Sequence, residues 1–198
     1  MDAAAAGGRP LMPSASLKVW RGSRVPCLAE LAAQCASTAA LAPPNPRLAE
    51  ENLLGWVLLL SAHFQGFCRD LHTEAGQAIS SRVRKTLAPV VHRAFVIDRA
   101  LDRGNPTLVN LKADFLRYGV LLDLAAADPA NHTRLACLSL MNTWRNIAAH
   151  HTPIPPTGLP TVADVQDWQA ACDGLAVSLD RVLYDGLRTL LRRAPWPP

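Results

Sequence analysis

One stretch decides the fold: residues 53–71, LLGWVLLLSAHFQGFCRDL. Its apolar side chains recur at alternating steps of four and three residues, at Leu53, Val57, Leu60, Phe64, Phe67 and Leu71. This spacing is typical of a helix that packs against another helix along one seam. Further apolar residues fill the other faces of its first half. The pattern predicts a long central helix, running to about Ser81 and surrounded by other elements.

Shorter apolar periodicities predict further helices, at about 29–38, 86–101, 107–124, 131–150 and from 161 onward. Proline-containing breaks separate them, at 42–46, 104–106, 128–129 and 152–160. Thr161-Val162-Ala163-Asp164 has the spacing of a capping box, with Asp in place of Glu. No segment alternates as a strand does. We therefore predict an all-α, up-and-down bundle of about five to six helices.

The chain has 198 residues, enough for one domain with a substantial core. Apolar residues make up 49% of it, which argues against disorder. We expect residues 1–44 to form a tail with a short first helix, and residues 1 to about 16 to be loose. Residues 45–193 should form the bundle, and 194–198 a short proline-rich tail.

The composition also favours a cytoplasmic protein. Five cysteines lie far apart, and an odd number without close pairs fits reduced thiols better than a disulfide framework. No apolar run is long enough to span a bilayer, and residues 2–8 do not resemble a signal peptide. The net charge is +4, and most of the basic residues are arginine, which favours a nucleic-acid partner weakly.

The helix at 131–150 carries a line of polar side chains on one face. Ser139, Asn142, Asn146 and His150 follow a 3-4-4 spacing, and Arg145 lies beside them, close enough for its long side chain to swing across. A polar line on so apolar a helix is costly to bury without partners. It indicates either a satisfied internal network or a functional site.

Several common sites are excluded by their motifs. The chain has no GxxxxGK[ST] or GxGxxG phosphate loop, no GxSxG nucleophile elbow and no HExxH zinc motif. Cys68 and His72 are the one pair at metal-ligand spacing, but zinc needs three or four ligands. An ordinary packed cysteine and a hydrogen-bonded histidine explain this pair better. We predict no metal and no cofactor.

Arg145 and His150 together carry the chemistry of metal-free RNA cleavage. An imidazole takes or gives a proton near neutral pH, and a guanidinium stabilises charge on a phosphodiester. Five residues on one helix turn through about 140°, which makes it hard for a single helix to close both groups on one phosphate. Two copies facing each other across a two-fold axis would supply two of each, so this chemistry predicts a homodimer.

At these residues the chain resembles the HEPN superfamily of small α-helical proteins, whose motif is Arg-(polar)-x-x-x-His near a helix end. The match is Arg145-Asn146-Ile147-Ala148-Ala149-His150. Residues 60–71 resemble the long central helix of bacterial members, in particular the RiboL-PSP-HEPN group of endoribonucleases. Gly104-Asn105-Pro106 and Lys112-Ala113-Asp114-Phe115 are similar more loosely. The likeness covers about residues 45–190.

The resemblance implies a dimer with a composite cleft, metal-independent endoribonuclease activity on RNA, and Arg145 and His150 as catalytic residues. Such proteins often act as toxins or in phage defence, and some pair with a nucleotidyltransferase antitoxin. The family often has Gly after the histidine, where this chain has His151. That second imidazole either assists the first or caps the helix.

Other residues have two interpretations each. Asn142 and Asn146 share the His150 face; Asn146 either orients His150 or the phosphate, or makes a structural bond. Asp70 and His63 could line the same cleft, although an ion pair and a polar seam neighbour are the commoner roles. The basic cluster could follow an RNA backbone or simply be solvated; its members are Arg82, Arg84 and Lys85.

Two functions therefore stay open. The first is a ribonuclease of the toxin or defence type. The second is a non-catalytic helical module that binds RNA, a nucleotide or a protein partner through the same cleft. In a purely structural role, Arg145 would pair with a carboxylate and His150 would bond to a carbonyl group.

Overall fold

The computed structural model describes residues 12–196, and within them it contains helices and no strand. The predicted all-α class is confirmed. Six α-helices of nine residues or more build this part of the chain: α2 (Val25–Ala39), α3 (Pro46–Ser80), α4 (Ala88–Val96), α6 (Leu108–Leu116), α8 (Asn131–His150) and α9 (Val162–Leu191). The short elements, which exceed the expected count, are α1 (Ala15–Val19), the π-helical turn η1 (Trp20–Arg24), α5 (Ala100–Arg103) and α7 (Leu124–Ala127).

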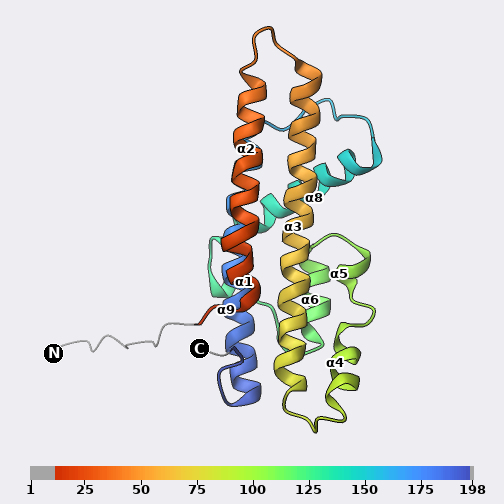
Figure 1. The fold of residues 1–198 in the computed structure, drawn as a ribbon, viewed down its shortest axis with the longest axis vertical. Coiled ribbons are helices and arrows are strands. Elements are labelled where there is room, and N and C mark those ends of the chain that lie inside the picture. Colours follow the sequence, from red (N-terminus) through yellow and green to blue (C-terminus); the bar gives the residue numbers. More distant parts are fainter. Residues whose placement is uncertain (1–11, 197–198) are drawn as a thin grey trace, which may run out of the picture.

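The long helices pack around α3 (Figure 1). Helices α2 and α3 run antiparallel, α9 lies beside both, and α8 crosses them obliquely and packs on α3 and α9. Helices α4, α5 and α6 lie along the second half of α3. The end of α8 lies beside the first half of α3, whereas α4 lies along the second half.

Helix α3 begins and packs as its sequence predicts. The Asn45 side chain accepts a hydrogen bond from the backbone N–H of Leu48 at 3.1 Å, and Pro46 occupies the first turn, where its missing N–H costs nothing. All six residues of the predicted seam are buried, and so is Trp56. The seam forms the centre of one continuous apolar core.

Helix α9 begins at the predicted capping box. The Thr161 hydroxyl accepts from the backbone N–H of Asp164 at 3.1 Å, and the Asp164 carboxylate accepts from the backbone N–H of Thr161 at 2.7 Å. Two otherwise unpaired N–H groups at the helix start are thus satisfied. The box prediction is confirmed.

The prediction that the first helix begins at about residue 29 is wrong. Helical backbone begins at Ala15 and continues through η1 to Ala39. Trp20 is fully buried, its ring centroid 5.8 Å from that of Phe64 and 5.7 Å from that of Phe67. Burial of this large aromatic side chain outweighs the weak helical signal of residues 15–28. Residues 1–11 lie outside the described part.

The C-terminal tail also differs from expectation. Trp196 lies within the predicted tail but is only 3% exposed and belongs to the apolar core. Residues 197 and 198 lie outside the described part. The bundle therefore includes apolar side chains from both segments that the sequence left as tails.

Two predicted helices are shorter than expected because tertiary hydrogen bonds replace helical ones. Helix α4 ends at Val96, and Arg117 donates to the carbonyl oxygens of Phe95 and Ile97, both at 2.8 Å. The buried Asp114 carboxylate accepts from the N–H groups of Ala100 and Leu101 at 2.8 and 2.9 Å and so starts α5. The helix expected over 107–124 ends at Leu116, before a left-handed glycine, Gly119 (φ +72°).

Two further predictions concern the whole chain. Within residues 12–196, no helix combines the length and the apolar character that crossing a bilayer requires. The five cysteines form no disulfide; Cys35, Cys68 and Cys172 are buried, Cys137 is half-buried and Cys27 is exposed.

Candidate functional site

Three residues of the polar line on α8 face a pocket of about 410 Å³ between α8 and the start of α6, and His150 is not among its lining residues. Ser139, Asn142 and Asn146 line it from α8, as the 3-4-4 spacing predicts for one helix face. Asn105 and Thr107 line it from the segment that leads into α6, and the remaining walls are mostly apolar: Leu108, Val109, Leu135 and Leu138. We refer to this cavity as the amide pocket.

Asn146 joins the two sides of the amide pocket. Its side-chain oxygen accepts from Nδ2 of Asn105 at 2.9 Å and from a guanidinium nitrogen of Arg145 at 3.2 Å. Asn110 in turn donates to the backbone oxygen of Asn105 at 2.8 Å, which fixes the turn before α6. Sequence reasoning missed Asn105 as a site residue, although Gly104-Asn105-Pro106 stood out as a turn.

Arg145 and His150 both lie near the end of α8, about 140° apart around the helix axis. The bond to Asn146 draws the guanidinium toward the polar line, and His150 follows Asn146 by four residues. At that spacing the Cβ atoms of neighbours on a helix lie about 5–6 Å apart. The site thus presents a guanidinium and an imidazole five residues apart, Arg145 half-exposed and His150 exposed.

Arg145 and His150 lack the partners that a structural role would give them. Within residues 12–196, Arg145 forms no ion pair, and neither side chain bonds to a backbone carbonyl group. Six other arginines pair with aspartates, at positions 21, 24, 69, 99, 103 and 134, whereas most of the described arginines, Arg145 among them, form no ion pair. Arg145 therefore keeps donors for an external anion.

Asn142 is an anomaly in the wall of the amide pocket. Its side chain is buried, 6% exposed, and neither its Nδ2 nor its Oδ1 has a hydrogen-bond partner among the described residues. A buried polar group left in this state costs about 1–3 kcal/mol of stability. A protein more often keeps such a destabilising group where the group serves a function.

The backbone of His151, rather than its imidazole, ends α8. Its backbone is left-handed, with φ +48°, and its N–H donates to the carbonyl oxygen of Ile147. A left-handed residue that follows the last helical turn is where glycine is most common. The His151 side chain lines a separate pocket of about 430 Å³, together with Glu50 and Glu51 of α3.

Asp70 and His63 belong to a different part of the molecule. Arg24 forms an ion pair with Asp70 and donates to the backbone oxygen of His63 at 3.0 Å. It crosses α3 at Gly66, where a Cβ would lie 3.1 Å from the guanidinium. Burial and the charge of Arg24 lower the pKa of His63. Asp70 lines a pocket to which α8 contributes no residue.

The basic cluster, Arg82, Arg84 and Lys85, is exposed in the turn after α3. The end of α8 shares a pocket with Leu54 in the first half of α3. At 1.5 Å per residue, the rest of α3 separates the two by roughly 40 Å. Figure 1 shows this turn and the end of α8 at well-separated places. The structure does not bring the cluster to the motif.

Cys68 and His72 form no metal centre. The His72 nitrogens contact the carbonyl oxygen of Asp114 at 3.1 Å and the hydroxyl of Tyr118 at 2.8 Å. Burial is the main cause that lowers the pKa of His72 to about 4 and raises that of Cys68. Among residues 12–196 no group of three or more His, Cys, Asp or Glu is placed to hold a metal ion.

We expect His72 to make the protein acid-sensitive. Its pKa of about 4 lies below the ordinary 6.5, so the unfolded chain takes up a proton that the folded one refuses. Stability should fall as the pH falls from 6.5 to 4, by up to about 3 kcal/mol. Urea unfolding across this range should show a shallower pH slope for His72→Gln. His132→Gln, on the exposed surface of α8, should keep the wild-type slope.

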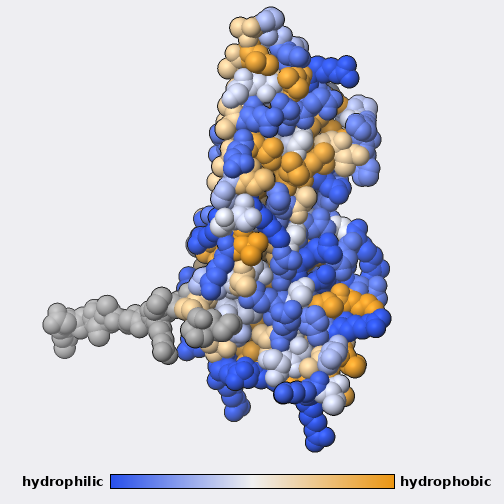
Figure 2. All heavy atoms as spheres, viewed as in Figure 1, coloured by the Kyte–Doolittle hydropathy of each residue, from blue (hydrophilic) through white to orange (hydrophobic). Residues whose placement is uncertain are grey.

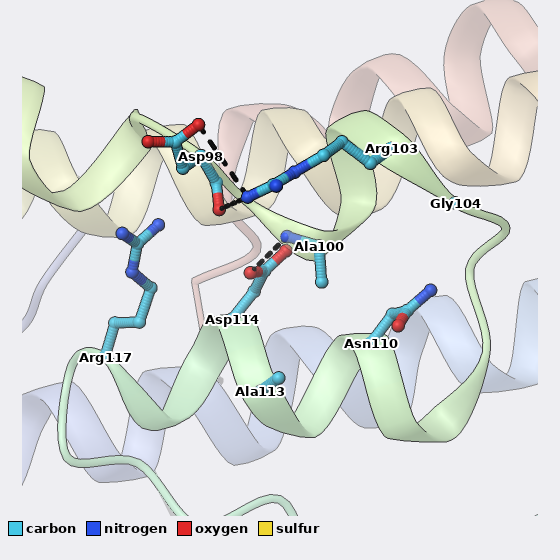
Figure 3. A pocket seen from close by; sticks show the side chains of 8 residues that line it. All are labelled: Asp98, Ala100, Arg103, Gly104, Asn110, Ala113, Asp114 and Arg117. Atoms are coloured by element: carbon cyan, nitrogen blue, oxygen red, sulfur yellow. Dashed lines mark hydrogen bonds and ion pairs between the residues drawn. The ribbon is translucent and has the colours of Figure 1, made fainter.

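A larger pocket, about 520 Å³, lies between α5 and α6 (Figure 3). Its charged side chains already have partners: Arg103 with Asp98, Asp114 with the start of α5, and Arg117 with backbone carbonyls. These contacts hold the corner between α4 and α6 together. The pocket is structural in character, and the amide pocket with Arg145 and His150 is the better candidate.

Comparison with known proteins finds no match to this chain among family models, curated proteins or solved structures.

Proposed function

We propose that this protein is a metal-independent endoribonuclease, with Arg145 and His150 as its catalytic residues. The observation that carries the proposal is the state of these two side chains. They lie five residues apart near the end of α8, and no carboxylate among the described residues neutralises the arginine. A surface guanidinium and an imidazole near one helix end suit a phosphodiester once a second copy completes the site.

The reaction needs one proton acceptor and one proton donor. An imidazole removes the proton of the ribose 2′-hydroxyl, and the oxygen attacks the adjacent phosphorus. Arg145 stabilises the charge that develops on the non-bridging oxygens. The bond from phosphorus to the 5′-oxygen breaks, and that oxygen takes a proton from a second imidazole. The products are a 2′,3′-cyclic phosphate and a 5′-hydroxyl end.

One chain offers one suitable imidazole at this site, because His151 lines another pocket. The second comes most simply from His150 of a second copy across a two-fold axis. Figure 2 shows apolar side chains gathered over the upper parts of α2 and α3, and Leu41, Leu48 and Leu59 are all more than 40% exposed. Apolar surface of this kind supports a homodimer.

The proposal is tested with purified protein and end-labelled RNA in excess EDTA. We expect cleavage, with fragments that carry 2′,3′-cyclic phosphate and 5′-hydroxyl ends. The matched control is the same RNA with 2′-O-methyl riboses, which should stay intact because the attacking hydroxyl is blocked. Intact RNA in the first reaction, or cleavage of the methylated RNA, would refute this mechanism.

In a cell, the proposal extends to a role as a toxin or a phage-defence effector, restrained by a partner such as a nucleotidyltransferase antitoxin. Expression of the wild-type chain should then inhibit growth, and His150→Ala should relieve the inhibition. Equal toxicity of the two chains would argue against a role for RNA cleavage in the cell.

A non-catalytic RNA-binding or nucleotide-binding module is the second candidate. The pocket of about 410 Å³ beside Asn146 favours binding of some ligand, with or without catalysis. Turnover separates the two functions. Many cuts per protein chain support the enzyme, whereas stable RNA binding without cuts supports the module.

A further inference from the structure

Helices α3 and α9 run parallel and stop at the same end of the bundle (Figure 1). The indole N–H of Trp56, in the first half of α3, donates to Gln169, in the first half of α9, at 3.3 Å. Further along, the backbone N–H groups of residues 14–15 donate in turn to Asp180 of α9 and to Glu74 of α3, at 3.2 and 2.8 Å. The last turns of the two helices therefore lie at the same level. The start of α4 lies there too, because a short turn joins it to the end of α3.

Exposed basic side chains from these three elements gather at this end. They are Arg82, Arg84 and Lys85 in the turn after α3, Arg93 in α4, and Arg188, Arg192 and Arg193 at the end of α9. No Asp or Glu occurs in residues 75–97 or 186–196. None of the seven forms an ion pair with a residue that the structure describes. We call this surface the basic end.

Aliphatic side chains lie exposed among the cations of the basic end. Leu87 is 52% exposed, Val90 66% and Leu190 57%. Leu190 stands between Arg188 and Arg192 in the last turn of α9. Helix α4 consists mostly of apolar residues, yet it buries none of its nine. Figure 2 shows apolar and hydrophilic side chains interspersed at this end. Such apolar groups would gain free energy if something covered them.

Cations and aliphatic groups on one surface match an anionic membrane. Lipid phosphates attract lysine and arginine, and the boundary between headgroups and acyl chains takes up leucine and valine. The cations by themselves would also attract RNA, but a phosphate backbone offers nothing to the aliphatic side chains. Single-stranded RNA typically stacks on exposed aromatic rings, and within residues 12–196 no Trp, Tyr or Phe side chain is exposed.

We propose that the basic end docks on the surface of an anionic lipid membrane. Leu87, Val90 and Leu190 enter the headgroup region, and the surrounding arginines and lysine contact lipid phosphates. The turn after α3 lies roughly 40 Å from the end of α8, so docking leaves Arg145 and His150 in solution. The proposal does not depend on the proposed ribonuclease function.

Flotation of the purified chain with lipid vesicles tests the docking. We expect the wild type to float with vesicles of equal parts phosphatidylcholine and phosphatidylglycerol, and not with phosphatidylcholine alone. The double variant Leu87→Ser, Val90→Ser should bind the mixed vesicles about tenfold or more weakly, because two aliphatic side chains no longer gain from burial. The double variant Arg192→Gln, Arg193→Gln should also lose about tenfold or more, since each cation near the surface contributes about fivefold.

The matched controls carry the same changes elsewhere on the surface. Leu140→Ser replaces a leucine on α8 that is 53% exposed, and Arg47→Gln replaces an exposed arginine in the first turn of α3, at the opposite end of that helix. Both should float as the wild type does. All the substituted side chains are exposed, and circular dichroism verifies that each variant is folded.

A wild type that ignores the mixed vesicles, or binds phosphatidylcholine alone equally well, overturns the proposal even if a variant does not fold. Undiminished flotation of folded Leu87→Ser, Val90→Ser overturns it as well, because charge attraction alone would then suffice. Fluorescence anisotropy with a labelled RNA covers the other macromolecule. If vesicles do not bind and Arg192→Gln, Arg193→Gln weakens RNA binding, the basic end serves RNA instead. RNA cleavage by a chain that does not bind vesicles removes the docking and leaves the nuclease, and flotation without cleavage does the reverse.

Discussion

Replacing His150 by alanine should reduce RNA cleavage at least about 100-fold, since loss of general acid–base catalysis typically costs 10²–10⁴ in rate. Arg145→Ala should cost a similar factor, because it removes the charge that stabilises the phosphorane-like transition state. Both side chains lie on the half-exposed to exposed end of α8, so we expect the unfolding free energy to change by less than about 0.5 kcal/mol. Initial rates on one RNA and urea unfolding measure the two quantities.

The matched controls are His132→Ala, on the exposed surface of the same helix, and Arg188→Ala, an exposed arginine of α9. Both should cleave RNA at the wild-type rate. Full activity of Arg145→Ala and His150→Ala would remove the assignment. Loss of activity in the controls as well would mean that activity depends on the net positive charge of the protein or on helix stability, and not on Arg145 and His150 in particular.

Mixing the two inactive variants tests whether the site is shared between copies. In a mixture of Arg145→Ala and His150→Ala, random pairing makes about half of the dimers mixed. A mixed dimer has one arginine and one histidine left, on different chains, and so lacks one of the two proton-transfer groups. Its rate should lie above that of either variant alone and well below the wild-type rate. A rate no higher than that of the separate variants, after the chains have been exchanged by dilution and reconcentration, would contradict a composite site.

Trp20→Ala should destabilise the protein by about 3–5 kcal/mol, the usual cost of deleting a large aromatic side chain from a core. Trp20 is fully buried against Phe64 and Phe67, and its indole N–H donates to Asp173 at 3.0 Å. Chemical denaturation followed by circular dichroism measures the loss. This prediction tests whether the N-terminal segment belongs to the bundle.

The neighbouring substitution Val19→Ala provides the control. Val19 is 48% exposed and belongs to the same helical segment, so we expect a change of at most about 0.5 kcal/mol. If Trp20→Ala is as mild as Val19→Ala, the segment before α2 does not contribute to the core. The sequence-based expectation of a tail would then be correct after all.

Periodicity and capping were the most reliable guides to this fold. The seam of α3 lies at the predicted residues because it is encoded within one helix, at a repeat that local geometry fixes. The capping box of Thr161 and Asp164 is likewise a contact between near neighbours in sequence. The sequence did not predict the helical segment before α2. The residue that anchors this segment is Trp20 of η1, and its burial depends on aromatic residues more than 40 positions away.

In the candidate site, too, the sequence predicts the features that are local in the chain and misses those that depend on distant contacts. The polar line through Asn142 and Asn146 follows from spacing alone, and these residues do share a pocket wall. Asn105 comes from another element, and no local pattern links it to Asn146. Asp70 shows the opposite failure: its position on α3 allowed a site role, but Arg24 from η1 pairs with it.

The sequence by itself determined the all-α class, the long central helix and the arginine, asparagine and histidine that end α8, because these features depend on residues within a few turns of one another. The tertiary structure alone decided where α4 and α6 stop, that Trp20 and Trp196 belong to the core, and that the polar line opens on a pocket completed by Asn105. Such features depend on contacts between distant segments, and a side chain such as Arg117 or Asp114 can end or start a helix only once folding has brought it there.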